Sequence, residues 1–260
     1  MPRTPVSVPV VLCLSGHDPI GGAGIQADIE TLAALGCHAA TAVTCLTVQD
    51  TRDVTRLVPT PVELLAAQIA AVRGDLRLAA VKVGLVGDAA LARLIADLAG
   101  DLAVPLVLDP VLAAGGGRDL GDGAIERAVA GLSSLARLAT PNRGEARRLT
   151  GRPDPDAAAR AMLESGCAAV LLTGADEAAG AEVVNRLYMP DEAPRDFVWP
   201  RLPGSFHGSG CTLASACAGL LARGEPLAAA VEAAQVFTWQ TLARAHAPGR
   251  GQQLPRRIAP

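Results

Sequence analysis

The sequence predicts a single domain of the α/β class, with a mostly parallel central sheet and helices on both faces. Apolar stretches of strand length alternate with longer helical stretches, a pattern typical of βαβ units. Half of the 260 residues are hydrophobic and only 2% are aromatic, so Ala, Val and Leu must form the core. No internal repeat or low-complexity linker divides residues 1–260, and this length suits one α/β domain.

The first half of the chain contains four short apolar stretches, as expected for buried parallel strands. We predict these strands at Val8–Ser15, Ala39–Leu46, Ala79–Val83 and Val104–Leu108. Between them, helices are predicted at Ile25–Leu35, Pro61–Val72 and Ala89–Ala99. Pro61 suits the first helical position, because a residue there needs no N–H donor.

The same alternation continues into the second half. Strands are predicted at Arg137–Thr140 and Ala168–Thr173. The helix Asp156–Glu164 lies between them and ends before Gly166, a residue type that often follows the last turn of a helix. These elements extend the predicted parallel sheet.

The last third departs from the alternation. The segment Glu182–Pro200 is typical of two or three short antiparallel strands joined by proline-containing turns. Two alanine-rich helices are predicted at Thr212–Arg223 and Leu227–Ala245. The tail from Pro248 is predicted to be a loop.

The composition argues against several classes of protein. The net charge is −3 and no long basic run is present, which argues against a nucleic-acid partner. No stretch reaches the roughly 18 apolar residues of a membrane span, so no membrane association is expected. The six cysteines form no CxxC pair and are typical of reduced thiols in a cytoplasmic protein.

Lys82 is the only lysine in the chain. It lies in the segment Val81–Gly84 and not in a GxxxxGK[ST] loop. A Walker-A nucleotide site is therefore excluded. Hydrolases that depend on the lysine of an SxxK motif are excluded for the same reason.

The segment Phe206–Leu213 carries the strongest functional signal. Gly208, Ser209 and Gly210 directly precede an apolar, alanine-rich helix. The free N–H groups and the positive dipole end of a helix start hold anions, most often phosphate. Cys211 falls in the first turn, where a thiol is expected to lose its proton more easily. A phosphate site beside a reactive group suggests phosphoryl transfer.

Polar residues or glycines follow nearly every predicted strand. In open α/β sheets, ligands bind beyond the carboxyl ends of the strands, so these residues are expected to share one site. In chain order they are Ser15, Gly16, Asp18, Thr47, Gln49, Asp50, Gly84, Asp109, Asn142, Glu145 and Gly208 to Cys211.

The glycine-rich stretch Gly21–Asp28 superficially matches a dinucleotide fingerprint. Its first matching glycine, Gly22, stands well beyond the end of the first strand, whereas a Rossmann turn follows its strand at once. We favour a loop that folds over a small substrate, with Asp28 reaching in from the first helix. An ordinary helix start with turn glycines is the alternative.

Asn142 and Glu145 stand at i and i+3 where a helix begins, so their side chains share one face. They could hold Mg²⁺, directly or through its water molecules, or form a capping box, and the spacing does not decide between the two. Asp109 follows a central strand and is expected to face the metal and the phosphates. The histidines show no metal-ligand spacing and are expected on the surface or in loops, with His207 beside the anion site.

Six motifs occur in order over most of the chain: Ser15–Asp28, Thr44–Thr51, Val81–Leu85, Val107–Val111, Thr140–Ala146 and His207–Leu213. Together they resemble the hydroxymethylpyrimidine/phosphomethylpyrimidine kinases of thiamine biosynthesis. The resemblance implies a ribokinase-like fold, ATP and Mg²⁺ as cofactors, and two successive phosphorylations of one pyrimidine. We also expect a homodimer.

The resemblance implies roles for individual residues. The pyrimidine pocket would be lined by Gly16, Asp28, Gln49, Leu85 and Val111, where Gln49 and Asp28 pair with the ring nitrogens and the exocyclic amine. The nucleotide and its phosphates would be held by Asp109, Asn142, Glu145 and Thr173, with Asp109 and Glu145 serving Mg²⁺ through water. The catalytic anion hole would be formed by Gly208, Ser209, Gly210 and Cys211. Many family members carry a lysine near the nucleotide phosphates, where this chain has Thr173 and Gly174.

Two other functions stay open at this point. A pyridoxal or pyridoxine kinase would share the fold and the Gly-Ser-Gly-Cys motif, although the stretch Gly21–Asp28 and Gln49 argue against it. A non-catalytic pyrimidine-binding regulator would share the fold as well. The presence of Asp109, Glu145 and Cys211 argues against that function.

Overall fold

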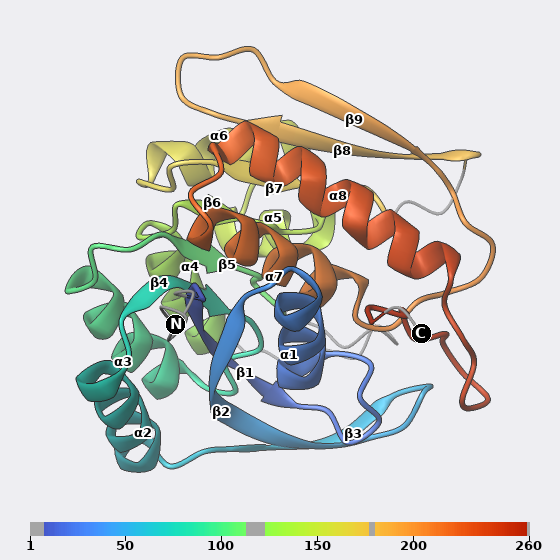
Figure 1. The fold of residues 1–260 in the computed structure, drawn as a ribbon. Helices are drawn as coiled ribbons and strands as arrows, with labels where there is room; N and C mark the ends of the chain where they lie inside the picture. Colours follow the sequence, from blue (N-terminus) through green and yellow to red (C-terminus); the bar gives the residue numbers. More distant parts are fainter. Residues whose placement is uncertain (1–7, 113–122, 177–179, 259–260) are drawn as a thin grey trace, which may run out of the picture.

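A computed structural model describes residues 8–112, 123–176 and 180–258. Within these residues a nine-stranded sheet has the order β3-β2-β1-β4-β5-β6-β7-β8-β9 (Figure 1). The strands are β1 Val10–His17, β2 His38–Gln49, β3 Val54–Pro59, β4 Leu78–Val83, β5 Leu106–Leu108, β6 Leu138–Ala139, β7 Val170–Leu172, β8 Glu182–Tyr188 and β9 Arg195–Pro200. The helices are α1 Gly24–Ala34, α2 Val62–Asp75, α3 Ala89–Gly100, α4 Gly123–Ser133, α5 Arg143–Thr150, α6 Pro155–Glu164, α7 Ser209–Ala222 and α8 Leu227–Ala243.

The middle of the sheet is parallel. The six strands β2, β1, β4, β5, β6 and β7 run in one direction. At the edges, β3 pairs antiparallel with β2, β8 with β7, and β9 with β8. The chain order changes direction at β1, between β2 and β4, and such switch points are where open α/β sheets bind ligands.

Helices cover both faces of the sheet (Figure 1). Buried side chains of α1, α7 and α8 form one core, and those of α2 to α6 form the other. Along β1, Leu12 and Leu14 belong to one core while Val11 and Cys13 belong to the other, because successive strand residues point to opposite faces. The predicted α/β architecture, a mostly parallel sheet with helices on both faces, is therefore confirmed. Among the described helices, none is both long and apolar enough to cross a membrane.

The predicted elements are all present, with ends displaced by a few residues, and the segment 182–200 forms the two strands β8 and β9. Pro61 is the N-cap residue of α2 and not its first helical residue. Two elements, β3 and α4, were not predicted, and of α5 only the start near Asn142 was expected. The strand β3 is short, ends in Pro59 and pairs on one side only. In α4 a signal was available, because Ile125, Val129 and Leu132 are buried at helical spacing.

Candidate active site

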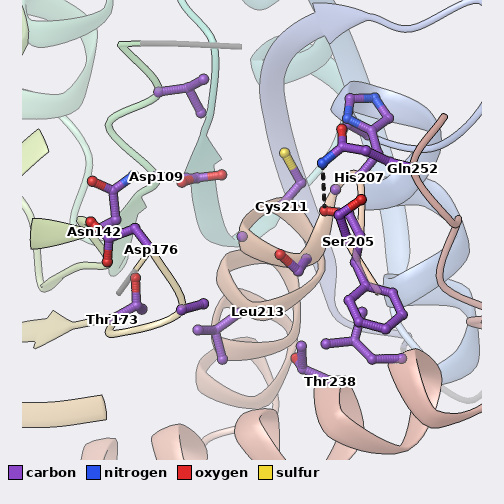
Figure 2. A pocket seen from close by; sticks show the side chains of 18 of the residues that line it. Asp109, Asn142, Thr173, Asp176, Ser205, His207, Cys211, Leu213, Thr238 and Gln252 are labelled. Carbon is purple, nitrogen blue, oxygen red and sulfur yellow. Dashed lines mark hydrogen bonds between the residues drawn. The ribbon is translucent and has the colours of Figure 1, made fainter. Parts of the chain in front are cut away.

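A cavity of about 510 Å³ opens at the carboxyl ends of the parallel strands, within the size range of small-molecule sites. It is lined by residues at the ends of β1, β2, β4, β5, β6 and β7 and by the start of α7. Figure 2 shows Cys211 near the middle, with Asp109, Asn142 and Thr173 to one side and His207 to the other.

The cavity brings together residues that are distant in the sequence. Of the site residues that the resemblance implies, all except Asp28 line it: Gly16, Gln49, Leu85, Asp109, Val111, Asn142, Glu145, Thr173, Gly208, Ser209, Gly210 and Cys211. Of the other strand-exit residues, Asp18 and Thr47 line it, whereas Ser15, Asp50 and Gly84 do not. The chemical role of each residue remains a proposal, but their shared position agrees with the expectation drawn from the strand exits.

The start of α7 is shaped to receive an anion. Gly208 precedes the helix with a φ of +80°, in the left-handed region that favours glycine. A Cβ at this position would lie 1.9 Å from the carbonyl oxygen of Gly22, so only glycine fits. Ser209, Gly210 and Cys211 begin the helix, and backbone N–H groups at a helix start have no acceptors within the helix. Their positions beside the cavity make them available to a phosphate group.

The thiol of Cys211 is less acidic than the sequence suggested. Burial and the neighbouring charge of Asp109 raise its pKa to about 12, and the charge of Lys82 offsets only part of this rise. The expectation that the helix start favours the thiolate is therefore wrong for this site. A nearby carboxylate and burial outweigh the helix dipole, whose effect is modest.

Asp28 lies beneath the cavity, and the prediction that it lines the pyrimidine pocket is wrong. Its side chain is fully buried in α1, and Oδ1 lies 2.8 Å from Nζ of Lys82. The hydroxyl of Ser215 in α7 donates to the same oxygen at 2.5 Å. An oxygen held by an ammonium and a hydroxyl inside the protein has a structural role here, and the side chain does not reach the cavity.

Lys82 connects this ion pair with the floor of the cavity. The ammonium donates to Oγ of Ser15 at 3.1 Å and is fully buried. Burial lowers its pKa, but the charges of Asp28 and then of Cys211 and Asp109 raise it more, so the pKa lies above the ordinary value. A Cβ on Gly84 would lie 2.7 Å from Nζ of Lys82, so this glycine leaves room for the ammonium.

Asn142 and Glu145 form the capping box that their spacing allowed. The side chain of Asn142 accepts from the N–H of Glu145 at 2.8 Å, and Glu145 Oε2 accepts from the N–H of Asn142 at 2.9 Å. Burial, followed by the charge of Asp109, raises the pKa of Glu145 to about 8. Burial also raises the pKa of Asp109, whose buried Oδ2 has no hydrogen-bond partner among the residues that the structure describes.

Asp18 and His207 join the glycine loop, residues 18–24, to the approach to α7. Oδ2 of Asp18 lies 2.9 Å from Nε2 of His207 and accepts from the N–H of Ala23 at 2.7 Å. Burial acts to raise the pKa of Asp18, but these bonds and the N–H of Ile20 lower it overall. His207 therefore occupies a defined contact at the cavity and is not a freely exposed loop residue.

The far end of the cavity is aromatic and was not predicted. Trp199 of β9 and Trp239 of α8 both line it, with ring centroids 6.5 Å apart and planes inclined by 28°. Gln235 accepts from the indole N–H of Trp199 and from the amide of Asn185. The sequence signal was weak, because an isolated Trp in an apolar segment usually belongs to the core.

Comparison with known proteins decides the family. Residues 18–256 match the sequence profile of the family described as phosphomethylpyrimidine kinase. The chain belongs to this family. The resemblance inferred from the six motifs is thereby confirmed, and the match includes the glycine loop, the start of α7 and the strand exits between them.

Curated relatives agree with this assignment. The chain is 37% identical over 244 residues to the hydroxymethylpyrimidine/phosphomethylpyrimidine kinase of Streptomyces coelicolor, covering 91% of this chain and 89% of the relative. It is 38% identical over 257 residues to the thiamine biosynthesis bifunctional protein ThiED of Geobacter sulfurreducens, covering 96% of this chain. In that case the chain spans only 52% of the relative's length.

A solved structure agrees in fold. The ADP complex of Bacillus subtilis pyridoxal kinase superposes with a TM-score of 0.89 at 25% identity, covering 96% of this chain and 98% of that one. The arrangement of helices and strands is thus shared between this phosphomethylpyrimidine kinase family member and a pyridoxal kinase. The fold alone does not distinguish their substrates.

The raised pKa of Cys211 predicts slow alkylation. Thiolate is the reactive form, and below the pKa its fraction increases about tenfold for each pH unit. We expect inactivation by iodoacetamide to accelerate from pH 7 to pH 9 without reaching a plateau, with labelling of Cys211 measured by mass spectrometry. In Asp109→Asn the nearby charge is absent, so labelling at a given pH should be faster. A plateau below pH 9 in the unaltered protein would contradict the assignment.

The buried ion pair predicts a large loss of stability when one partner is removed. In Lys82→Met the Asp28 carboxylate is left without its counter-charge, and we expect a loss of about 3–5 kcal/mol in urea unfolding. The variant Asp28→Asn/Lys82→Met should recover much of it. The control Glu232→Gln breaks an exposed pair with Arg195 and should cost less than about 1 kcal/mol. Similar small losses for Lys82→Met and Glu232→Gln would sink this interpretation.

Proposed function

We propose that this chain transfers the γ-phosphoryl group of ATP to the hydroxymethyl oxygen of 4-amino-5-hydroxymethyl-2-methylpyrimidine, and then to the monophosphate that results. The observation that carries the proposal is the cavity itself. It is lined together by the start of α7 with Cys211, by residues of the glycine loop and by Trp199 and Trp239. The names of the family and of the Streptomyces coelicolor relative support the same reaction.

The proposed pyrimidine pocket is the end of the cavity lined by Gly16, Gln49, Leu85 and Val111. The amide nitrogen of Gln49 donates to Oγ1 of Thr47 at 2.5 Å, which fixes the orientation of the carboxamide. Its oxygen and its second N–H then face a ring that carries both acceptors and an amine. The aliphatic side chains pack against the faces of the ring and its methyl group.

The proposed phosphoryl site is the start of α7. Transfer of a phosphoryl group depends mainly on positioning and on stabilising charge, which the N–H groups of Ser209, Gly210 and Cys211 supply. The high pKa of Cys211 favours a thiol that orients the substrate hydroxyl over a thiolate that removes its proton. Gly208 leaves room for this turn to lie against the glycine loop.

Mg²⁺ fits the opposite wall of the cavity. Oδ2 of Asp109 is buried and has no partner within the described part of the chain, and a cation or its water would satisfy it. We propose that Asp109 and Glu145 hold the ion through water, with Asn142 positioning Glu145 through the capping box. The ion would neutralise charge on the nucleotide phosphates. No lysine follows β7, so Thr173 would contact the nucleotide without adding a charge.

The aromatic end of the cavity suits the base of ATP. Trp199, Trp239 and Leu242 line this end and offer flat apolar surface, while Thr238 adds a hydroxyl. The solved structure of the Bacillus subtilis pyridoxal kinase contains ADP, which supports nucleotide binding in this fold. Pyridoxal kinase activity is the second candidate function, because that enzyme superposes over nearly the whole chain.

We also propose that residues 1–260 act as one domain in the cytoplasm, as a homodimer. Leu46 and Val48 of β2 and Val58 of β3 are 56%, 57% and 41% exposed. Leu46 and Val58 are cross-strand partners, and Val48 lies on the same face of β2 as Leu46. The three side chains therefore form one apolar patch on the antiparallel strand pair β2 and β3. Contiguous exposed apolar patches are typical of protein interfaces.

The proposed reaction is tested by assaying three substrates with ATP. We expect ADP and phosphorylated product from the hydroxymethylpyrimidine and from its monophosphate, because the pocket suits that ring, and loss of both on chelation of Mg²⁺. Mass spectrometry identifies the products. Turnover of pyridoxal alone would assign the protein to the second candidate function. Pyrimidine binding without ATP consumption would indicate a regulator.

The proposed assembly is tested by sedimentation velocity. The unaltered chain should sediment as two copies, and Leu46→Glu/Val48→Glu should sediment as one, because charges in the apolar patch oppose its burial. Val198→Glu is the matched control, since Val198 is an exposed strand residue of β9 at 53% exposure. Sedimentation of the unaltered protein as a monomer would reject the proposed dimer.

A further inference from the structure

The C-terminal segment, residues 246–257, is tied to the site although the sequence suggests only a loop. The N–H groups of Gly251 and Gln252 donate to the hydroxyl and the carbonyl of Thr51 at 2.9 and 2.7 Å. Thr51 lies just beyond Gln49, at the end of β2. A Cβ on Gly251 would lie 2.1 Å from the Thr51 carbonyl oxygen, so the two backbones are in close contact.

The same segment pairs with the approach to α7. Gln253 donates its N–H to the carbonyl of Ser205 at 2.9 Å and accepts from the N–H of His207 at 2.9 Å. Leu254 packs on the glycine loop, since a Cβ on Gly22 would lie 2.6 Å from its Cδ2. The segment therefore touches the glycine loop, the end of β2 and the chain that leads into the anion site.

Arg257 makes the most specific of these contacts. Its guanidinium is 1% exposed, and Nη2 donates to the carbonyl of Gly22 at 2.5 Å. Nε donates to Oγ1 of Thr212 at 2.8 Å, one residue after Cys211. Nη1 lies 3.1 Å from Oε2 of Glu30 in α1. One planar group thus holds the glycine loop, the first turn of α7 and α1 in fixed relation.

The contact to Gly22 lies at the tightest packing point between the loop and α7. The carbonyl oxygen that accepts from Arg257 is the one that would collide with a side chain at Gly208. The hydroxyl of Thr212, which accepts from Nε, itself donates to the carbonyl of Gly208 at 2.8 Å. Both ends of the guanidinium therefore control where Gly208 stands relative to the glycine loop.

We infer that Arg257 is a positioning residue for phosphoryl transfer. It holds the glycine loop, residues 18–24, at a fixed distance from the turn at Gly208 to Cys211. This inference rests on the proposed function. The glycine loop lines the same cavity as the proposed pyrimidine pocket, and the turn is the proposed phosphoryl site, so the separation of loop and turn would affect the approach of the attacking oxygen. Lysine cannot replace Arg257, because an ammonium lacks the planar fork that reaches three acceptors in different directions.

The experiment compares Arg257→Lys and Arg257→Ala with the unaltered chain. We expect kcat/KM for the hydroxymethylpyrimidine to fall about 10²-fold in both, as a misplacement of about 1 Å can cause. The affinity for ADP, measured through the fluorescence of Trp199 and Trp239, should stay nearly unchanged because Arg257 contacts neither residue. Added methylguanidinium should restore part of the activity of Arg257→Ala.

Two controls separate positioning from folding. Arg256→Ala removes the exposed neighbouring arginine, and Glu30→Gln removes only the charge partner, so both should keep kcat/KM. A drop in melting temperature with normal kcat/KM at low temperature would overturn the inference, as would an equal loss of ADP affinity or an absence of methylguanidinium rescue. Failure of the unaltered chain to phosphorylate the pyrimidine would instead reject the proposed function.

Discussion

Two opposite charges, the carboxylate of Asp28 and the ammonium of Lys82, lie completely out of water 2.8 Å apart. Each requires the other, since an unpaired charge in the interior would be strongly destabilising. The pair joins α1 to β4, and hydrogen bonds from Ser215 and to Ser15 extend it to α7 and β1. The ion pair and its hydrogen bonds thus connect four elements beneath the cavity that Cys211 and Asp109 line.

Above this ion pair, close backbone contacts define the site. Gly24 has a φ of +57°, and a Cβ there would lie 2.1 Å from the carbonyl oxygen of Gly16. Gly208 approaches Gly22 in the same way. Such contacts bring polar backbone groups to the ligand without intervening side chains. The side chains of Asp18, His207 and Arg257 then connect the glycine loop to the approach and first turn of α7.

The sequence was sufficient for the order of the elements, the sheet class and most of the cavity lining, because strand exits in a parallel sheet converge at one edge. It was insufficient to place the side chain of Asp28. Because Asp28 closely follows the glycine loop in the sequence, we expected it to reach the substrate. Its partner is 54 positions further along, and the available signal was the single lysine in an apolar strand, which needs an anion when buried. Cys211 was misjudged for a related reason, since its pKa is raised by burial and then by the carboxylate of Asp109, which is distant in the sequence and follows β5. The tryptophans and Arg257 depend on long-range packing that no local pattern reports.

The hydrogen bond between Arg257 and Gly22 joins residues that are 235 positions apart, which has a consequence for the order of folding. Bringing such distant segments together requires closure of a very long loop, a slow step compared with the formation of local helices and neighbouring strand pairs. The parallel sheet and the core formed by α2 to α6 do not require a contact of this length, whereas the core that joins α1 to α7 and α8 does. The binding site is therefore expected to form late in folding, together with that second core.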